Sequence, residues 1–312
     1  MLPKSVGEHA HKDTQCQEDH APLNISSGTV QKHRSFLLGT RRVPGYLVQG
    51  GAKSLHDSFL VSSDRNQINR DLLLAALGDK WPADLIQVAA EMLADSASRF
   101  PSGPRRLPGE LVRAIQRERL LVGMLRAVSE LGYRSTNVQD VIERAGVSRP
   151  TFYEHFANKD DCFLAAFDTS AARLRDQIET AAHEGGDVWR DRVRSGFNAL
   201  LAFAAAEPEA ARMVIVEARA ATPDAARRRV ALLDYFASCL DTKVRELLPA
   251  TTAPSTVTAS GVVGGVESLL YARLNKNQMD DLPALLPSLM YFAVLPYEGH
   301  LAASEELGLK TT

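Results

Sequence analysis

Cysteine is scarce in this sequence, and long apolar runs are missing from it. The 312 residues include three cysteines, Cys16, Cys162 and Cys239, which are too few and too scattered for a disulfide framework. The N-terminus also lacks the charged-then-apolar pattern of a secretory signal. These features favour a reduced, cytoplasmic setting. Because no run of about 18 apolar residues occurs, we expect no membrane span.

Enzyme signatures are missing as well. The sequence has no G-x-S-x-G, no H-E-x-x-H, no Walker glycine–lysine loop and no dinucleotide-binding glycine fingerprint. We therefore expect no enzyme activity and no cofactor, with a helical enzyme of unlisted type as the remaining alternative. No segment alternates between apolar and polar residues with a period of two, so no β-strand is predicted and an all-α fold is expected.

The net charge is only −2, which does not by itself indicate a nucleic-acid-binding protein. Residues 105–167 hold 10 Lys and Arg against 8 Asp and Glu, a net of +2, whereas residues 168–312 hold 15 against 19, a net of −4. Residues 1–104 balance at 11 against 11. The positive region supports DNA binding without proving it. Arg105 and Arg106 form either a basic arm for DNA or part of a solvated linker.

The N-terminal third has two parts. Residues 1–60 are polar and lack a sustained hydrophobic period, so we expect a disordered tail. Residues 61–104 are expected to form a helical extension and linker, with an amphipathic hairpin at 68–98. This hairpin either packs on the body of the protein or serves as an accessory interaction element. Four side chains of metal-binding type lie in the tail, with a spacing that fits no standard zinc site: His9, His11, Cys16 and His20.

The stretch 136–161 predicts two short helices around a tight turn. Apolar residues of the first helix recur on one face, at Val138, Val141, Ile142 and Ala145. Gly146 then ends this helix, because glycine adopts the left-handed conformation without a Cβ penalty. Ser148 can cap the second helix, and Pro150 fits its first turn. A short helix, a glycine turn and a second helix form the helix-turn-helix pattern.

Two longer helices are predicted on either side of this stretch. One covers Glu110–Leu131, carries an apolar stripe and ends at Gly132. Asn158 is expected to cap the other, with Asp161 in capping-box position. A brace of this kind supports the shorter helices of a helix-turn-helix domain.

Many residues across this region match a known family in type and spacing: Gly132, Tyr133, Thr136, Val141, Ile142, Ala145, Gly146, Val147, Ser148, Thr151, Phe152, Tyr153, His155, Phe156 and Lys159. The pattern resembles the tetracycline-repressor (TetR) family of bacterial transcription regulators. The resemblance implies a helix-turn-helix three-helix domain followed by a helical ligand-binding and dimerisation bundle. It also implies a homodimer that represses transcription until a small-molecule effector releases it from DNA. The extension 61–104 lies outside the resemblance.

The predicted recognition helix opens with three candidate base-contacting residues. Arg149 has the donors to grip guanine O6 and N7 with two hydrogen bonds. Pro150 and Thr151 follow and would contact a thymine methyl group or a sugar. Pro150 stands where the family often has glycine, which leaves the base contact at that position open.

The resemblance implies four further contacts to the DNA backbone. Tyr153 and Lys159 would contact phosphates. His155 would lie near the backbone, and Thr136 would cap its helix against a phosphate. The alternative for Tyr153 and His155 is that they simply pack against the domain.

The remainder of the chain is expected to be helical throughout. Candidate helices are Val188–Ala206, Glu209–Ala221, Pro223–Leu248, Ser255–Asn275 and Leu282–Leu295. Helices of this kind pack as a bundle, which can enclose an apolar ligand pocket. Candidate pocket residues are Phe203, Met213, Val216, Tyr235 and Tyr271, with an ordinary filled core as the alternative. The run Arg227 to Arg229 is interpreted as a solvated face or a salt-bridged turn.

The last two helices are the candidate dimer surface. Their glycines would let helix backbones approach closely, and their leucines form a broad apolar surface. The candidate interface residues are Gly261, Gly264, Gly265, Leu285, Leu286, Leu289 and Phe292. A single-chain core is the alternative. Two copies related by a two-fold axis would bind a palindromic operator in double-stranded DNA.

The sequence thus predicts a DNA-binding transcriptional regulator with no metal site and no membrane contact. Its predicted domains are a tail at 1–60, an extension at 61–104, a DNA-binding domain at 105–167 and a bundle at 168–312. The alternative keeps DNA binding but places control with a protein partner that contacts the N-terminal extension. An intact ligand cavity would favour the first model. A filled bundle core beside an exposed apolar face on 68–98 would favour the second.

Overall fold

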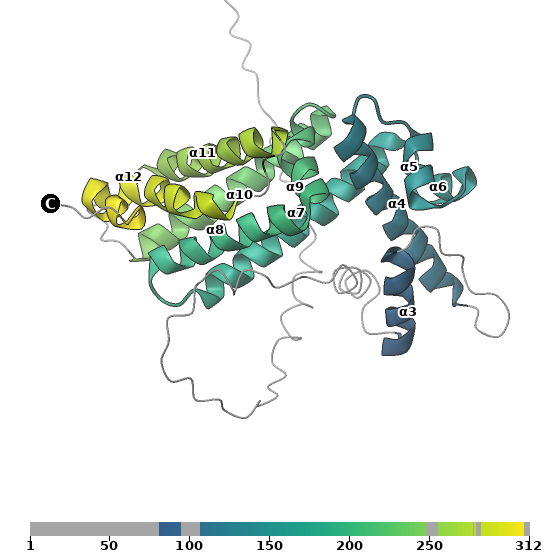
Figure 1. The fold of residues 1–312 in the computed structure, drawn as a ribbon, viewed down its shortest axis with the longest axis horizontal. Coiled ribbons are helices and arrows are strands. Elements are labelled where there is room, and N and C mark those ends of the chain that lie inside the picture. Colours follow the sequence, from purple (N-terminus) through teal and green to yellow (C-terminus); the bar gives the residue numbers. More distant parts are fainter. Residues whose placement is uncertain (1–80, 95–106, 248–254, 277, 279–281, 309–312) are drawn as a thin grey trace, which may run out of the picture. The chain divides into compact units, whose positions relative to one another are not determined.

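The computed structural model describes residues 81–94, 107–247, 255–276, 278 and 282–308. These residues all belong to one compact unit, Leu55–Thr312. The predicted tail at 1–60, the first helix of the predicted hairpin and the linker arginines Arg105 and Arg106 lie outside the described residues. Within the described residues the structure contains helices and no strand, so the all-α prediction is confirmed (Figure 1).

The helices follow one another along the chain as Figure 1 labels them. The α-helices are α3 (Ala83–Ala94), α4 (Gly109–Leu131), α5 (Val138–Ala145), α6 (Arg149–His155), α7 (Lys159–Glu184), α8 (Trp189–Ala206), α9 (Pro208–Ile215), α10 (Pro223–Leu247), α11 (Thr256–Asn275) and α12 (Leu286–Glu306). Two short 3-10 helices are η3 (Glu217–Arg219) and η4 (Pro283–Leu285).

Helices α4, α5 and α6 form the three-helix domain. Helix α5 begins with a capping box, in which Asn137 accepts from the backbone of Asp140 and the Asp140 carboxylate accepts from the backbone of Asn137. It ends at Gly146, whose φ of 64° is the left-handed conformation expected from the sequence. Helix α4 packs closely on α5 at Gly123, which is buried against the backbone of Val141 and Ala145. The predicted long brace is therefore confirmed.

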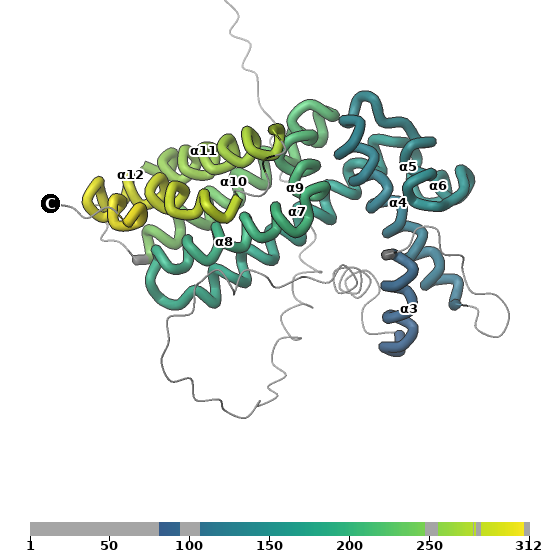
Figure 2. The backbone as a smooth tube through the Cα atoms, viewed as in Figure 1, coloured from purple at the N-terminus to yellow at the C-terminus, as the bar shows by residue number. Residues whose placement is uncertain are grey.

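Helix α7 connects the three-helix domain to the bundle. Its N-cap is Asn158, whose side chain accepts from Asp161 N at 2.9 Å, as the sequence predicts. The helix then continues to Glu184, so the predicted domain boundary after residue 167 falls inside one continuous helix. In Figure 2 the tube of α7 runs on into the bundle beside α8. A continuous helix transmits displacement between its ends because its backbone is hydrogen-bonded throughout.

Helices α7 to α12 form the bundle, and one hydrophobic core extends from it into the three-helix domain. Phe152 of α6, Phe163 of α7 and Leu201 of α8 belong to the same buried cluster. Helix α3 forms a second cluster with the N-terminal half of α4, where Ile115 and Ala89 are fully buried. The described half of the predicted hairpin therefore packs on the body of the protein.

Two helix boundaries differ from the predicted ones. The predicted helix Glu209–Ala221 breaks into α9 and η3 at Val216, where the chain turns before α10. The last helix continues past Pro296 to Glu306, with a kink at Gly299. Pro296 predicted the end of this helix, but ion pairs made by Glu305 and Glu306 hold the segment after it against α8.

Candidate DNA-binding surface and ligand cavity

Helix α6 is anchored by its apolar residues and exposes its N-terminal face. Its N-cap Ser148 accepts from Thr151 N at 3.3 Å. Phe152 is fully buried and Phe156 is nearly so, which fixes the orientation of the helix. On the other faces Arg149 and Pro150 are exposed. Arg149 and Pro150, two of the three predicted base-contacting residues, are therefore presented to solvent. The third, Thr151, is half-buried, and its Oγ1 lies 2.8 Å from Ser148 Oγ.

Tyr153 lies one turn further along α6 and is 51% exposed. Its ring packs edge-on against Phe152, with 5.3 Å between ring centroids. This contact holds the ring at the surface. The geometry suits a phosphate contact, and the alternative that Tyr153 is a core residue does not fit its exposure.

Thr136 and Lys159 are placed differently from the prediction. The Thr136 side chain is buried and donates to Gly132 O at 2.9 Å, and Asn137 is the residue that caps α5. The predicted helix cap at Thr136 is therefore wrong by one residue, because the Asn137 side chain has the better geometry for capping. Lys159 donates to Tyr133 O and Thr136 O, both at 3.0 Å. Its ammonium has three donors, so one remains for a phosphate.

His155 ends α6 and is half-buried. Its Nε2 is buried and has no hydrogen-bond partner among the residues that the structure describes. Burial lowers the pKa of His155 below its ordinary value, and the positive charges of Arg113 and Arg117 lower it further. The lowered pKa favours the neutral imidazole. The place of His155 near the DNA backbone stays a prediction, with packing against the domain as the alternative.

Arg113 and Arg117 are candidate DNA-contacting residues that the sequence analysis did not single out. They lie four residues apart on α4, so they share one helix face. The guanidinium of Arg117 lies over the Phe156 ring, 5.7 Å from its centroid, and Arg113 is exposed. The i, i+4 spacing was visible in the sequence, but only the fold shows that this face adjoins the end of α6.

A cavity of about 550 Å³ lies inside the bundle, between helices α7 to α11. This volume is within the usual range of about 300–1,000 Å³ for small-molecule sites. Its wall is mostly apolar and includes Ile178, Phe197, Leu200, Phe236 and Val266. The predicted bundle pocket therefore exists as a cavity.

Of the five candidate pocket residues, Tyr235 lines this cavity. Phe203 and Met213 are 2% and 1% exposed and fill the core outside the lining. Val216 and Tyr271 pack against the same core and are also outside the lining. These four assignments are wrong for this cavity, because residue type shows which side chains are apolar but not which of them border empty space.

Two charged residues line the cavity at the α10–α11 interface. Arg229 of α10 donates through Nη1 to the Glu267 carboxylate of α11 at 2.9 Å. Arg219 of η3 donates to the same carboxylate, through Nε at 3.1 Å and also through Nη2. Of the two interpretations of Arg227 to Arg229, the solvated face is wrong for Arg229, which is largely buried and salt-bridged to Glu267. Its neighbours fit that interpretation, since Arg227 pairs with Asp224 at the surface.

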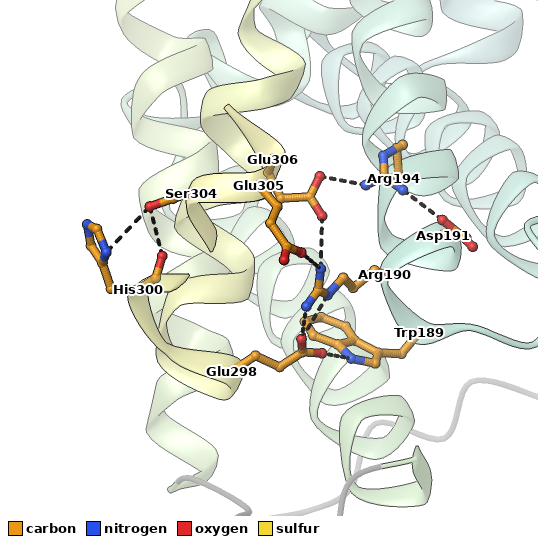
Figure 3. Close-up of polar contacts among 9 residues, drawn as sticks. All are labelled: Trp189, Arg190, Asp191, Arg194, Glu298, His300, Ser304, Glu305 and Glu306. Carbon is orange, nitrogen blue, oxygen red and sulfur yellow. Dashed lines mark hydrogen bonds and ion pairs between the residues drawn. The ribbon is translucent and has the colours of Figure 1, made fainter. Parts of the chain in front are cut away.

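Trp189 lines the cavity near the N-terminus of α8 and is held by residues of α12. Its indole Nε1 donates to Glu298, and its ring packs edge-on against Tyr297. Arg190 donates to the same carboxylate through Nε at 2.8 Å and pairs with Glu305 at 3.1 Å (Figure 3).

The ion pairs of Figure 3 tie the last segment of α12 to α8. The Glu306 side chain is 6% exposed and pairs with Arg194 at 2.5 Å. These contacts lie on both sides of the Gly299 kink, and they hold the helix end that the sequence analysis missed. They also fix the orientation of the Trp189 ring in the cavity wall.

Comparison with known proteins gives a family for the N-terminal part of this site. Residues 120–166 match the family model described as bacterial regulatory proteins, tetR family. This chain contains a TetR-family DNA-binding domain. The matched residues run from α4 to α7 and include the whole exposed face of α6. The TetR resemblance predicted from the sequence is confirmed.

Individual relatives of the TetR-type chain agree with this assignment. The HTH-type transcriptional activator FasR from Mycolicibacterium smegmatis is 28% identical over 126 residues, which cover 39% of this chain and 57% of FasR. The fatty acid degradation regulator FadR from Bacillus halodurans superposes with a TM-score of 0.52 at 20% identity, covering 64% of this chain and 97% of that one. FadR from Bacillus subtilis, in complex with stearoyl-CoA, gives 0.50 at 18% identity over 58% and 97%.

These likenesses differ in what they establish. The solved structures show that the TetR-type chain shares their fold. The matches to three curated relatives cover between 37% and 57% of the relatives' lengths. No helix in the described ranges has the length and apolar character to span a membrane. The described residues also include no group of three or more His, Cys, Asp or Glu side chains placed to hold a metal.

The candidate dimer residues of the TetR-type chain divide by exposure. Leu289 is fully buried and Leu285 nearly so, which places both inside the protomer. Phe292 covers Gly265, where an added Cβ would lie 2.5 Å from the Phe292 ring. Leu289 and Leu285 are therefore unavailable to a partner, and their assignment to the interface was wrong because α11 and α12 already pack on each other and on α8. Gly265 is half-buried beside Phe292, and its place in the interface stays a prediction.

The rest of the predicted dimer surface remains accessible. Gly261 and Gly264 have no atom within 4 Å of an added Cβ. Phe292 is 40% exposed, Leu286 is half-buried, and the neighbouring Leu269 of α11 is 45% exposed. The dimer stays a prediction, now centred on the outer faces of α11 and α12.

Proposed function

We propose that this protein is a ligand-responsive transcriptional regulator that reads DNA through α6 and acts as a repressor. One observation carries the proposal: a TetR-type recognition helix with an exposed N-terminal face shares one hydrophobic core with a bundle that contains an apolar cavity. This arrangement supports two binding roles, of DNA by α6 and of a small molecule by the cavity.

The ligand that we propose is a largely apolar small molecule in the α7–α11 cavity. The apolar wall supports this, and so does the stearoyl-CoA bound by FadR from Bacillus subtilis, a protein of the same fold. An apolar ligand gains free energy from the burial of its surface at about 25 cal/mol per Å². We infer that its binding shifts the population of bundle conformations.

Contacts between the bundle and the three-helix domain support the coupling of ligand to DNA. Glu217 of η3 accepts from the backbone N–H of Tyr133 at 3.0 Å. The Tyr133 hydroxyl in turn bonds Asp160 in the first turn of α7, and Lys159 donates to Tyr133 O. A displacement of η3 would therefore act directly on the loop that joins α4 to α5.

We propose a homodimer that binds a palindromic operator. Two recognition helices related by a two-fold axis match two major grooves about 34 Å apart on one face of B-DNA. The outer faces of α11 and α12 are the proposed contact. Because the target is chromosomal DNA, a cytoplasmic location goes with this proposal, as does the absence of enzyme activity.

The second regulator model, with a protein partner bound to the N-terminal extension, is less well supported. This model predicts a filled bundle core together with an exposed apolar face on residues 68–98. Helix α3 instead buries Ala89, Ala90 and Leu93 against α4, and the bundle core contains a cavity. Both observations favour control by a ligand.

Selection of DNA from a random-sequence duplex library tests the proposal. The purified full chain should enrich an inverted repeat with half-site centres about 10 base pairs apart or a multiple of that. Lowering the salt concentration should strengthen binding to all duplexes, because phosphate contacts release counterions. Enrichment of no sequence over several rounds would contradict the proposal.

A further inference from the structure

The polar end of the cavity has an excess of positive charge. Two guanidinium groups, Arg219 and Arg229, share the single carboxylate of Glu267, which leaves a net charge of +1. The Glu267 side chain is 9% exposed and that of Arg229 is 19% exposed. A buried charge that is not balanced costs several kcal/mol, so this arrangement favours an additional anion.

Hydrogen bonding at the same place is also incomplete. Arg229 uses Nη1 for Glu267, but its Nε is buried and has no acceptor within the described part of the chain. Arg229 and Glu267 both line the cavity, so a ligand can reach the guanidinium from inside it. The Arg229 guanidinium therefore lacks both a balancing negative charge and a hydrogen-bond acceptor for its Nε.

The other charged residues of the lining, Glu179, Lys243 and Arg192, differ from Arg229. The Glu179 carboxylate accepts from the Tyr235 hydroxyl and lies 3.5 Å from Arg175. Lys243 pairs with Glu246 at 2.7 Å and is half exposed, and Arg192 donates to the carbonyl oxygen of Gly186. Their charges are solvated or partnered. The pull on an anion is therefore strongest at Arg229.

The apolar part of the lining sets the shape of the ligand. Along α10 the lining runs from Arg229 to Val244, a span of 15 helical rises and about 22 Å at 1.5 Å per residue. The wall over this length carries Leu232, Phe236 and Leu240. An elongated apolar chain with an acidic group at one end matches both the wall and the charge.

We propose that the cavity binds an amphipathic anion, with its acidic head group on Arg229 beside Glu267 and its apolar chain along α10 toward Trp189. This inference rests on the proposed ligand response and names its chemistry. The head group competes with Glu267 for Arg229, and Glu267 also holds Arg219 of η3. Binding therefore changes the contact that anchors η3, whose Glu217 bonds the Tyr133 backbone.

The test uses two probes of equal chain length and different charge, dodecanoate and dodecanol. Each is titrated into the full chain carrying Trp81→Phe. The sequence has two tryptophans, so this substitution leaves Trp189 as the only one. Fluorescence of Trp189 then reports occupancy of the cavity. Wild-type binding of dodecanoate should be about tenfold tighter than that of dodecanol, as a charge-assisted hydrogen bond predicts.

Variants of this protein assign the difference to Arg229. Arg229→Gln should weaken dodecanoate about tenfold and leave dodecanol unchanged. Arg227→Gln on the same helix, where the side chain is 73% exposed, is the matched control and should change neither probe. Glu267→Gln removes the competing carboxylate and should tighten dodecanoate. It serves as the second test if Arg229→Gln fails to fold.

Three results would overturn the inference. These are equal affinity for the two probes, unchanged dodecanoate binding in Arg229→Gln, or no binding of either probe. The library selection separates this failure from failure of the regulator itself, because it is done without any ligand. A chain that selects an inverted repeat but ignores the charge of its ligand is still a regulator, with a different ligand class.

Discussion

Arg149 is the residue on which base readout depends in this account. It opens α6, is exposed, and stands beside a buried Phe152 that fixes the helix. Arg149→Ala should weaken binding to the selected duplex by roughly 1–3 kcal/mol and relax the preference at one base pair. Fluorescence anisotropy at one fixed salt concentration measures this. Tyr153→Phe, which removes a phosphate contact, should instead weaken all duplexes alike, and an unchanged Arg149→Ala titration would refute the base contact.

His155 gives the domain a dependence on pH that can be worked out in sign. Its pKa is lowered in the folded state, so between its ordinary value and the lowered one the unfolded chain binds a proton that the folded chain does not. Acid therefore destabilises the fold through His155. This destabilisation is absent above the unfolded pKa and grows as the pH falls toward the folded pKa. Urea unfolding at about pH 7.5 and about pH 5.5 should show a smaller difference in His155→Gln than in the wild type.

Two buried carboxyl groups have the opposite effect to His155 on how stability depends on pH. Burial raises the pKa of Glu118 and of Glu207, so acid lowers the cost of burying them. They are present in both proteins and cancel in the comparison.

At the scale of helices, Gly123 sets how closely α4 approaches α5. A Cβ there would lie 2.7 Å from Val141 O, a backbone atom that cannot move without its helix. Gly123→Ala should therefore destabilise the domain by about 1–3 kcal/mol, the usual cost of overpacking. Gly109→Ala at the start of α4, an exposed position where nothing lies within 4 Å, is the control and should stabilise by up to about 1 kcal/mol. Equal unfolding midpoints for both variants would refute the close contact.

The short helix η3 is the element that joins the ligand cavity to the DNA-binding domain. Glu217→Ala removes the acceptor of the Tyr133 N–H, so DNA should still bind while its response to dodecanoate falls. Coupling energies are typically about 1–3 kcal/mol, which corresponds to a response at least about fivefold smaller. Glu209→Ala in the preceding helix is the control. The same ligand response in Glu217→Ala as in the wild type would exclude this route.

Local signals in the sequence predicted most helices and their caps. Ser148, Gly146 and Asn158 function as predicted because a cap or a left-handed turn depends on a few neighbouring residues. The kink at Gly299 was missed because it depends on partners far away in sequence, such as Trp189 and Arg190 on Glu298. Periodicity carries no information about such partners.

The site residues were predictable to the extent that they are local. Arg149 and Pro150 are exposed at the start of α6 as expected. Arg229 was grouped with its two neighbours as a solvated face or a salt-bridged turn, and its place in the cavity wall was not predicted. Three consecutive arginines look alike in sequence. Their separate environments arise from the 100° turn between successive residues of a helix and from what packs on each face.

At the scale of the whole molecule, the dimer predicts two different outcomes for two leucines. Leu269→Asp places a charge on the exposed face of α11, where a partner would desolvate it, so it should give folded monomers. Leu289→Asp places a charge in the protomer core, so it should unfold the bundle. Sedimentation with circular dichroism distinguishes the two. A Leu269→Asp protein that stays dimeric at micromolar concentration would place the interface elsewhere.

The central claim is that occupancy of the bundle cavity controls DNA binding by α6. One titration measures both events in one sample: the Trp81→Phe protein on a labelled selected duplex receives dodecanoate, while Trp189 fluorescence reports the cavity and duplex anisotropy reports DNA. The account predicts that both signals change over the same range of concentration, with DNA released as the cavity fills. A cavity signal that saturates while the duplex stays bound with unchanged affinity would contradict it.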